Sequence, residues 1–423
     1  MVYFPPVVLP ECLPARAGTP SASSRLGEAR GLSPAKPNPP SADPRASVHP
    51  AAVPRALPTA REPRAVVLVG AGASARRLYF PALHTLQLAG ALAVRAVVDP
   101  GAAGIEAARE TFPNAIHAAS FDTLPALPNA LAIVATPIRQ HMAQTNAALK
   151  RGWHVLCATP LAANAGDATI MIAAAQRHER FLAIDFRSRF FPAIRYLRTL
   201  CEDHLLGPAL SFRVHVGYAG TGTGEGMASD KPLRPEGALT TLGGPCLELL
   251  TWCFGNAAIG KYADDAMGGV EANAVIDLAF RDGLRGTVHL SRDWPAEDSY
   301  TVVFERGIAR WTGSRVNALT LQLASAPAAL AGELVAPLSA VHSHPAAPLL
   351  SSEDEAGVAM LENILAAIDG RETLQVPATE VMHSLPLIDA CYAQRSPLLQ
   401  PWLSRNDAAH ARALSPPAAL RRP

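Results

Sequence analysis

Paired cysteines are absent from this sequence. No Cys-x-x-Cys pair occurs, and the cysteines stand far apart, at Cys12, Cys157, Cys201, Cys246, Cys253 and Cys391. Because such pairs are typical of zinc sites and redox dithiols, the sequence indicates neither. We expect reduced thiols in a cytoplasmic protein, and no metal site.

Excess charge and long apolar runs are also missing. The formal net charge is +1, which gives no electrostatic reason to expect a nucleic acid or an acidic partner. No uninterrupted apolar run approaches the roughly 18 residues of a membrane span. The apolar start, Met1–Pro10, is broken at Pro5 and Pro6 and has no basic region, so it is a poor signal peptide.

The two ends of the chain have the composition of disordered segments. Residues 1–63 hold 14 of the 38 prolines, and Ala, Ser and Arg fill much of the rest. Such a segment buries too little apolar surface to offset its ordering entropy, which predicts disorder over 1–63 and over the similar tail 404–423. The acid-poor, Arg-bearing start also suits an organellar transit peptide, and this alternative stays open.

From Arg64 the chain alternates between apolar runs and helical segments. This alternation predicts a parallel, doubly wound sheet of the Rossmann type over residues 64–186. The predicted strands are Ala65–Val69, Val94–Val98, Ala115–His117, Leu131–Val134, Val155–Cys157 and Leu182–Ile184. The predicted helices include Ser74–Ala89, Arg139–Lys150 and Ala163–Arg177.

From about Leu210 the apolar period becomes two, and hairpin turns are predicted at Asp282-Gly283 and Arg306-Gly307. These patterns predict a second α/β domain, residues 187–403, with a large, mostly antiparallel open sheet. Its predicted strands are 210–218, 270–280, 284–290, 300–304 and 308–311, its helices are Glu353–Ile368 and Ala378–Gln394, and 325–350 is predicted as a surface loop.

A phosphate-binding turn is predicted where the first strand ends, at Gly70-Ala71-Gly72-Ala73-Ser74-Ala75. Gly70 permits the tight turn, Gly72 lets the backbone approach a pyrophosphate, and Ala75 lets helix and strand pack closely. The helix N-terminus then offers N–H groups to the phosphates. The turn follows a strand, opens a helix and precedes an acid at the end of the second strand, which is the context that this pattern requires.

That acid is Asp99, which we expect to accept hydrogen bonds from the adenosine ribose. Alternatively, Asp99 only starts the turn Asp99-Pro100-Gly101 at the surface. Pro100 and Gly101 offer no cation for a 2′-phosphate, which favours NAD over NADP.

Later motifs resemble the glucose–fructose oxidoreductase/inositol dehydrogenase/rhizopine-catabolism (Gfo/Idh/MocA) family. The resemblance covers about 65–403 and is carried by Ala135-Thr136-Pro137 with His141, by Val155–Leu161, Phe186–Pro192 and Gly237–Leu250, and by Ile368-Asp369-Gly370. It implies NAD or NADP in the first domain and oxidation or reduction of a sugar, polyol or related carbonyl compound against the second. It also implies cofactor contacts at Ala135, Thr136, Pro137, His141, Thr159 and Pro160.

The sequence departs from this family at its proton-handling positions. The family's catalytic lysine lies in Glu-Lys-Pro, where this chain has Ala158-Thr159-Pro160. The family's Asp and His correspond here to Thr241 and Pro245, and Glu248 keeps the acid that follows. Thr does not ionise near neutrality and Pro does not hydrogen-bond through its side chain, so the usual base for alcohol oxidation is missing.

Other residues are candidates to replace it. We take Thr159, Arg189, Lys231 and Thr241 as possible catalytic residues. Arg189 follows the sixth strand and would hold an anionic substrate or, alternatively, face solvent. Lys231 and Arg234 follow a Gly-rich stretch, residues 217–226, that would form a mobile lid.

Further polar residues are better explained by structure than by catalysis. Each of His215 and His289 lies alone on a strand, which usually indicates a structural histidine. Cys246 and Cys253 fall on one helix face, where core packing is the better interpretation.

Three functions remain open. The first is an NAD(P)-dependent oxidoreductase with a divergent site, which transfers hydride to or from a small carbonyl, imine or sugar-like substrate. The second is a redox-inactive nucleotide-binding regulatory protein of the same fold. The third is an enzyme that uses NAD without net redox change. In each case we expect a small-molecule ligand and a homo-oligomer that pairs through the open sheet.

Overall fold

The computed structural model describes residues 62–217, 237–266, 270–293, 298–313, 315–324, 334–337, 350 and 352–398. The predicted tail 404–423, residues 1–61 of the predicted N-terminal disorder, Lys231, Arg234 and most of the predicted lid lie outside these ranges.

Within the described ranges, six parallel strands form the first sheet in the order β3-β2-β1-β4-β5-β6. Their bounds are β1 Arg64–Val69, β2 Leu92–Val98, β3 Ile116–Ala118, β4 Leu131–Val134, β5 His154–Cys157 and β6 Leu182–Ile184. Strands β2 and β3 follow β1 toward one edge of the sheet, and β5 and β6 follow β4 toward the other edge. The carboxyl ends of the neighbours β1 and β4 therefore flank the crevice in which such sheets bind ligands.

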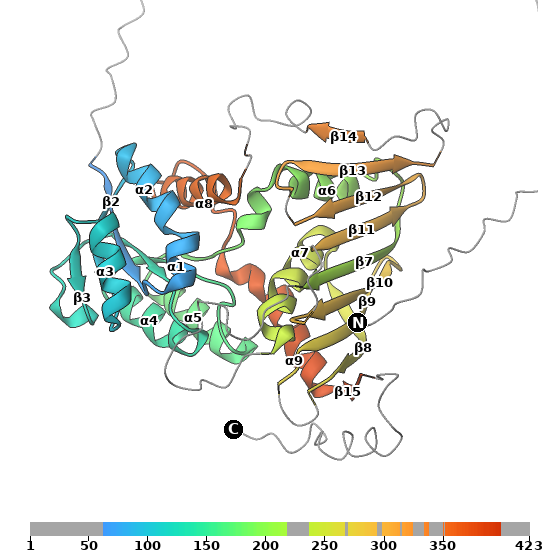
Figure 1. Cartoon of the computed structure of the whole chain (residues 1–423), viewed down its shortest axis with the longest axis horizontal. Helices are drawn as coiled ribbons and strands as arrows, with labels where there is room; N and C mark the ends of the chain where they lie inside the picture. Colours follow the sequence, from blue (N-terminus) through green and yellow to red (C-terminus); the bar gives the residue numbers. More distant parts are fainter. Residues whose placement is uncertain are drawn as a thin grey trace, which may run out of the picture. The chain divides into compact units, whose positions relative to one another are not determined.

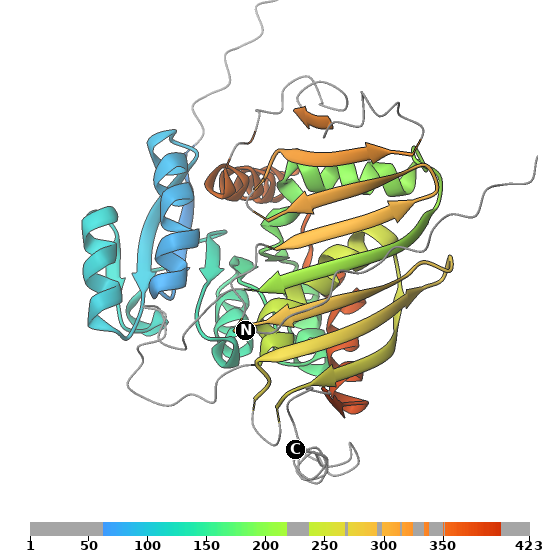
Figure 2. The ribbon, with the colours of Figure 1, turned by 45° about the vertical axis from the view of Figure 1, so that its right-hand side comes forward.

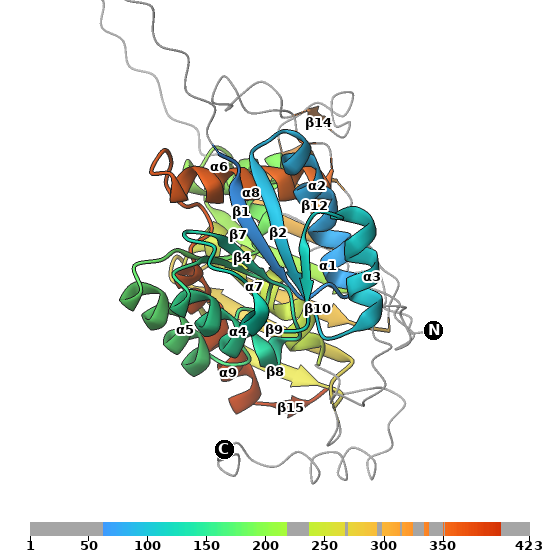
Figure 3. The same ribbon diagram turned by 90° about the vertical axis from the view of Figure 1, so that its left-hand side faces the viewer.

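Helices cover both faces of this sheet. The helices that connect the first three strands are α1 Ala73–Leu78, α2 Phe80–Leu88 and α3 Ala102–Thr111, and those that follow β4 and β5 are α4 Ile138–Lys150 and α5 Ala165–Arg177. Figure 3 shows α1, α2 and α3 on one side of the strands and α4 and α5 on the other. All four residues of β4 are buried, as a strand covered on both faces requires.

Two predicted helices are each divided in the structure. The segment Ser74–Ala89 breaks at Tyr79, and Ala378–Gln394 breaks at Ser384 into the 3₁₀ helix η4 (Ala378–His383) and α9 (Leu385–Ala393). The cause is the same in both, because Pro81 and Pro386 lie in the first turn of the second piece. Proline has no N–H to give to the preceding turn, so it starts a helix more readily than it continues one.

The second sheet contains, among the described residues, nine strands in the order β14-β13-β12-β11-β7-β10-β9-β8-β15. Their bounds are β7 Ala209–Gly217, β8 Ala257–Asp264, β9 Asn273–Phe280, β10 Arg285–Ser291, β11 Ser299–Phe304, β12 Gly307–Thr312, β13 Ala318–Leu323, β14 Leu334–Pro337 and β15 Ser396–Pro397. Neighbours are antiparallel except β7 with β10 and β8 with β15, so the sheet is mostly antiparallel, as predicted.

The prediction of a surface loop over 325–350 is wrong for residues 334–337, which form β14 against β13. The rest of that predicted loop lies outside the described residues, apart from Leu350, which is buried. Strands β8 and β13 and helices α3 and α6 were not predicted.

One face of this sheet is covered by helices, as Figures 1 and 2 show. The covering helices are α6 Pro192–Glu202, α7 Gly244–Phe254 and α9. Side chains alternate along β7, so that Phe212 and Val214 are buried under the helices and Arg213 is exposed on the opposite face. A further helix, α8 (Glu353–Ile368), packs against α2 of the first sheet. No helix in the described part of the chain is long and apolar enough to cross a membrane.

Candidate cofactor and active site

Gly70 is a glycine because the fold demands it. Its φ is +93°, a conformation that other residues rarely adopt, and a Cβ there would lie 2.5 Å from the carbonyl oxygen of Ala135. The Gly70 N–H donates to the carbonyl of Val98 at 2.8 Å. The ends of β1, β2 and β4 are thereby drawn together under the turn.

Gly72 differs from Gly70, because the folded chain itself leaves room for a side chain there. Its backbone is extended, with φ −65° and ψ 177°, and no atom beyond Gly72 and its two chain neighbours lies within 4 Å of the position that a Cβ would take. Gly72 is the N-cap of α1, and the side chain of Ala75 is buried beneath that helix. The open space therefore lies beside helix N–H groups that have no partner within α1.

Asp99 fastens the phosphate-binding turn from the end of β2. Its Oδ2 accepts a hydrogen bond from the Ala71 N–H at 2.7 Å, and its Oδ1 accepts one from the Gly101 N–H at 2.6 Å. The second bond belongs to the surface turn that the sequence offered as the alternative role. A carboxylate has about four acceptor positions, so both roles are compatible with a ribose contact.

Thr136 provides a test of whether a dinucleotide fits. Its hydroxyl oxygen is buried and has no hydrogen-bond partner. Leaving a buried hydroxyl unpaired costs about 1–3 kcal/mol. A ribose or phosphate oxygen in the crevice beside β4 would supply the missing partner, so the residues fit the expected cofactor.

His141 joins two of the predicted cofactor segments. It is 2% exposed. Its Nε2 lies 2.7 Å from the carbonyl oxygen of Thr136, and its Nδ1 lies 2.9 Å from that of Pro160. The ring therefore contacts the loops after β4 and β5.

Thr159 and Thr241, which the family resemblance aligns with two of the family's proton carriers, are not joined to each other by a hydrogen bond. Thr159 follows β5 and is partly buried. Thr241 lies on η3 (Leu239–Gly243), a π-helix, and its hydroxyl donates to the Gly237 carbonyl at 3.0 Å. Pro245 is exposed at the start of α7. A threonine hydroxyl that donates its proton to the main-chain carbonyl of Gly237 is not arranged as a base.

Arg189 does not face solvent, so that alternative is wrong. Its residue is 4% exposed, and its Nε donates to Glu248 Oε1 at 2.6 Å. Its Nη2 also pairs with Glu380 at 3.4 Å. Burial raises the pKa of Glu248, and the Arg189 guanidinium opposes that rise. This pair ties η2 (Arg187–Phe190) to α7, which favours a structural role over substrate binding.

The strand histidines face each other. His215 on β7 and His289 on β10 are register partners, and their rings stack with centroids 4.8 Å apart. Burial lowers the pKa of both, to about 4 for His289. Cys246 and Cys253 are buried, in agreement with core packing.

Sequence reasoning missed a polar chain beneath η3. The Tyr392 hydroxyl donates to Glu271 Oε1 at 2.7 Å and contacts the Thr240 hydroxyl at 3.0 Å. Glu271 is 3% exposed, and a Cβ on Gly237 would overlap its carboxylate. No local pattern marks these residues, because Tyr392, on α9, lies 121 positions beyond its partner Glu271 in the sequence.

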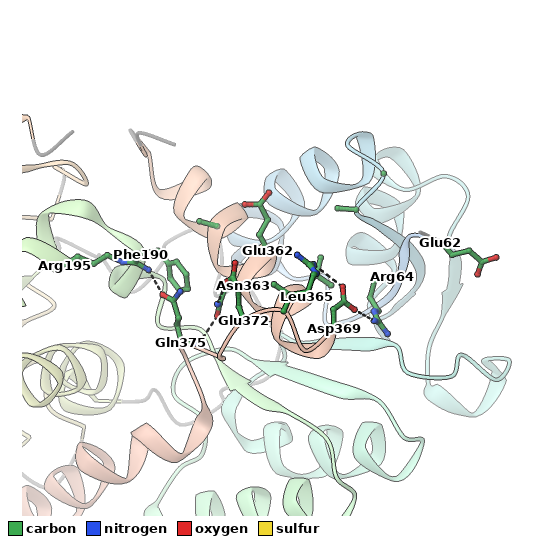
Figure 4. A pocket seen from close by; sticks show the side chains of 15 residues that line it. Glu62, Arg64, Phe190, Arg195, Glu362, Asn363, Leu365, Asp369, Glu372 and Gln375 are labelled. Carbon is green, nitrogen blue, oxygen red and sulfur yellow. Dashed lines mark hydrogen bonds and ion pairs between the residues drawn. The ribbon is translucent and has the colours of Figure 1, made fainter. Parts of the chain in front are cut away.

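A cavity of about 510 Å³ lies elsewhere. Arg64, the first residue of β1, lines it, whereas the predicted phosphate-binding turn follows the last residue of β1. In Figure 4, Arg195 and Gln375 lie at one end of this cavity, and Arg64 pairs with Asp369 at the other. It is therefore distinct from the predicted cofactor site. In the described parts of the chain, no three His, Cys, Asp or Glu side chains gather as a metal site would require.

Comparison with known proteins identifies relatives of both sheets. Residues 64–186 match the model of the Gfo/Idh/MocA oxidoreductase family, NAD-binding Rossmann fold, and residues 194–310 match the family's C-terminal domain. Trans-1,2-dihydrobenzene-1,2-diol dehydrogenase of Sus scrofa is 27% identical over 198 residues, which make up 45% of this chain and 57% of that protein. The chain spans just over half the length of the first curated relatives that it matches.

Solved structures share the fold at low identity. The WlbA dehydrogenase from Bordetella pertussis, in complex with NADH and UDP-GlcNAcA, has a TM-score of 0.63 and 19% identity over 78% of this chain and 95% of its own. KijD10, a 3-ketoreductase from Actinomadura kijaniata in complex with TDP-benzene and NADP, has a TM-score of 0.64 and 16% identity over 80% of this chain and 100% of its own.

Both family models match in the expected order, the first over the parallel sheet and the second over much of the mostly antiparallel one. The chain therefore belongs to the Gfo/Idh/MocA family of oxidoreductases, with an NAD(P)-binding Rossmann fold.

Proposed function

We propose that this protein is an NAD-dependent oxidoreductase that reduces a small, already electrophilic carbonyl, imine or sugar-like compound in the cytoplasm. The observation that carries the cofactor assignment is the empty space at Gly72, where the chain leaves room beside the N-terminus of α1. The Thr136 hydroxyl, which has no hydrogen-bond partner, lies in the loop after β4, the strand next to β1 in the sheet.

Asp99 supports NAD over NADP. Its carboxylate is held by Ala71 and Gly101, so it has little freedom to turn away from a ligand at the turn. A 2′-phosphate beside it would meet a like charge, and such juxtaposition costs several kcal/mol.

The chemistry follows from what this chain's residues do and do not provide. Bound NADH would supply the hydride. The protein's part is to hold a substrate near it, and positioning alone supplies roughly 7–11 kcal/mol of a barrier. Thr241 is engaged with Gly237, and Arg189 with Glu248, so neither is arranged as a base for alcohol oxidation. Reduction of a substrate that is electrophilic or brings its own proton makes the smallest demand on such a site.

The same observations favour one alternative, a redox-inactive nucleotide-binding regulator of this fold. Such a regulator would keep the nucleotide-binding residues Gly70, Gly72 and Asp99. It would need none of the proton carriers that are replaced at Thr159, Thr241 and Pro245.

The deciding experiment is a fluorescence titration of the full chain with NADH and NADPH, repeated on Gly72→Val. The expected result is tighter binding of NADH and loss of binding in Gly72→Val, whose side chain fills the open space. Tighter binding of NADPH would remove Asp99 from the ribose role. If neither cofactor binds, the phosphate-binding turn has lost its function. Both the oxidoreductase and the nucleotide-binding regulator are then refuted.

We also propose that two copies pair through the uncovered face of the second sheet, where Arg213 and the His215–His289 stack lie. Light scattering measures the mass in solution. A monomer at all concentrations would refute the pairing, and Arg213→Glu should shift the mass toward the monomer, because it reverses a charge on that face.

A further inference from the structure

The cavity of about 510 Å³ in Figure 4 has no part in the proposed reaction. Its volume lies within the range of roughly 300–1,000 Å³ that is usual for small-molecule sites. Ala359, Glu362, Asn363 and Ala366 line it, and because they recur every three or four positions, one face of α8 forms a wall. Residues of β1, of α6 and of the loop after α8 complete the lining.

Arg195 of α6 is held in a fixed position at one end of this cavity. Its Nε donates to the Arg189 carbonyl at 2.7 Å, and its Nη2 donates to Gln375 Oε1 at 2.5 Å. Its guanidinium carbon lies 5.1 Å from the centre of the Phe190 ring. A guanidinium carries five N–H donors, and these two bonds use two of them. The remaining donors are available to a ligand.

The charge of Arg195 is not balanced by the protein. No carboxylate of the described residues forms an ion pair with it, whereas Arg64 and Arg371, at the other end of the cavity, both pair with Asp369. Partial burial lowers the pKa of Arg195, and no carboxylate opposes that change. A carboxylate on a bound molecule would supply the missing negative charge and accept from the fixed guanidinium.

Glu362 and Glu372 give the same cavity two carboxylates. Within the described ranges, neither forms an ion pair, and Glu372 Oε2 accepts a hydrogen bond from Asn363 Nδ2 at 3.0 Å. Partial burial raises the pKa of Glu362, and the charge of Glu372 raises it further. A positively charged group close to both carboxylates would relieve their repulsion. A further carboxylate, that of Glu62, lies beyond Arg64 in Figure 4.

Asn363 makes these groups part of one built wall. It is 4% exposed, its Oδ1 accepts the Gln375 N–H at 2.9 Å, and its Nδ2 also donates to the Thr373 carbonyl at 3.0 Å. One buried side chain therefore fixes the loop that carries both Glu372 and Gln375, and Gln375 in turn holds Arg195. Groups that are held in place before a ligand arrives lose less entropy when it binds.

We propose that this cavity binds a small zwitterion, whose carboxylate pairs with Arg195 and whose ammonium group pairs with Glu362 and Glu372. The side chains of Phe190 and Ala359 would contact an aliphatic stem between the two charges. A ligand with a single charge would leave either the guanidinium or the two carboxylates unbalanced. The site is separate from the proposed function and needs no cofactor.

Three probes with the same six-carbon stem test this by isothermal titration calorimetry on the full chain. They are 6-aminohexanoate, which has both charges, hexanoate, which has only the carboxylate, and hexylamine, which has only the ammonium group. We expect 6-aminohexanoate to bind at least about tenfold more tightly than either of the others. Hexylamine of equal affinity would remove Arg195 from the site, hexanoate of equal affinity would remove the two glutamates, and absence of 6-aminohexanoate binding would refute the site.

Two variants assign the charges. Arg195→Gln should weaken binding of 6-aminohexanoate about tenfold and leave that of hexylamine unchanged. Glu362→Gln should weaken 6-aminohexanoate and leave hexanoate unchanged. The matched controls are Arg281→Gln, in the turn between β9 and β10, and Glu110→Gln, on α3, which change exposed residues outside the cavity and should bind as the wild type does.

Melting temperatures show whether each variant is folded when its affinity is measured. Glu362 is exposed and forms no ion pair in the described part of the chain, so Glu362→Gln decides the matter even if Arg195→Gln does not fold. A folded Glu362→Gln protein with the wild-type affinity for 6-aminohexanoate would overturn the proposal. Titration with NADH tests the proposed function separately, because either ligand can bind without the other.

Discussion

The carboxylate of Asp99 accepts a 2.7 Å hydrogen bond from the main-chain N–H of Ala71, so the acid that ends β2 holds the turn that ends β1. The residue that we expect to choose the cofactor thus also shapes the loop that binds it. Asp99→Asn keeps an oxygen that accepts from Ala71 and removes the charge. We predict that it narrows the preference for NADH over NADPH by about tenfold, since relief of repulsion by roughly 1.4 kcal/mol has that effect. Parallel titrations measure it, and an unchanged ratio would mean that Asp99 serves the turn alone.

The two glycines of the turn should respond differently to alanine. In Gly70→Ala, the Cβ meets the Ala135 carbonyl in a backbone conformation unfavourable to alanine, so we predict a loss of more than about 2 kcal/mol of unfolding free energy. Gly72→Ala places its Cβ in open space and should stay within about 1 kcal/mol. Urea unfolding distinguishes them. Equal losses would show that Gly72 also serves the fold.

The replacements that the family resemblance implies at Thr159, Thr241 and Pro245 predict a poor polyol dehydrogenase. We expect no appreciable oxidation of inositol, glucose or similar polyols at neutral pH, and activity, where present, in the direction of reduction. A substrate panel run both ways with NAD and NADH checks this, beside Thr159→Lys, which restores the family's lysine. Brisk polyol oxidation by the native protein would point to Lys231 or a strand histidine as the base. Tight cofactor binding without turnover in either direction would favour the regulatory function.

The Arg189–Glu248 pair should matter for stability more than for catalysis. Glu248→Leu leaves a buried guanidinium without its nearest carboxylate, so we predict a loss of about 3–5 kcal/mol. Glu202→Leu removes a carboxylate from the exposed Arg198–Glu202 pair and should change the unfolding free energy by less than about 1 kcal/mol. A Glu248→Leu protein of native stability but raised KM would instead place Arg189 on the substrate.

His154 should make the protein sensitive to acid. Burial, with Arg180 and Arg64, lowers the pKa of His154 to about 4, and its Nδ1 accepts the Phe181 N–H at 3.1 Å. The unfolded chain protonates this ring near pH 6.5, and the folded chain does so only near pH 4. Its stabilising contribution is therefore complete above about pH 6.5 and is lost as the pH falls toward 4.

Between pH 7 and pH 5 this amounts to about 2 kcal/mol. His154→Gln, which keeps an acceptor for Phe181, should lose less stability over that interval than the wild type does. Urea unfolding at both pH values measures the difference, and equal losses would contradict the assignment to His154.

The sequence predicted best those parts that local chemistry determines. The strands Leu131–Val134 and Leu182–Ile184 have their predicted bounds, because a wholly buried strand reads as an uninterrupted apolar run. β8 escaped prediction because its burial does not alternate and Gly260 and Lys261 interrupt its apolar residues.

The same division applies to the site. The turn and its acid follow from short-range patterns, and the structure places Asp99 against Ala71. The partners of Arg189 and His141 could not be predicted. Glu248 lies 59 positions from Arg189, and the carbonyl of Pro160 reaches His141 only once β4 and β5 lie side by side.

The place of β7 in the second sheet bears on how the chain folds. Strands β8, β9 and β10 pair as sequence neighbours, as do β11, β12, β13 and β14, so each group forms a meander of short-range contacts. β7 is bound on its two edges by β10 and β11 and by neither strand next to it in the chain. Long-range pairings of this kind slow folding because loop closure must precede them. β7 therefore joins two meanders, and we predict that its long-range pairing with β10 and β11 is the step that limits the folding rate of the whole sheet.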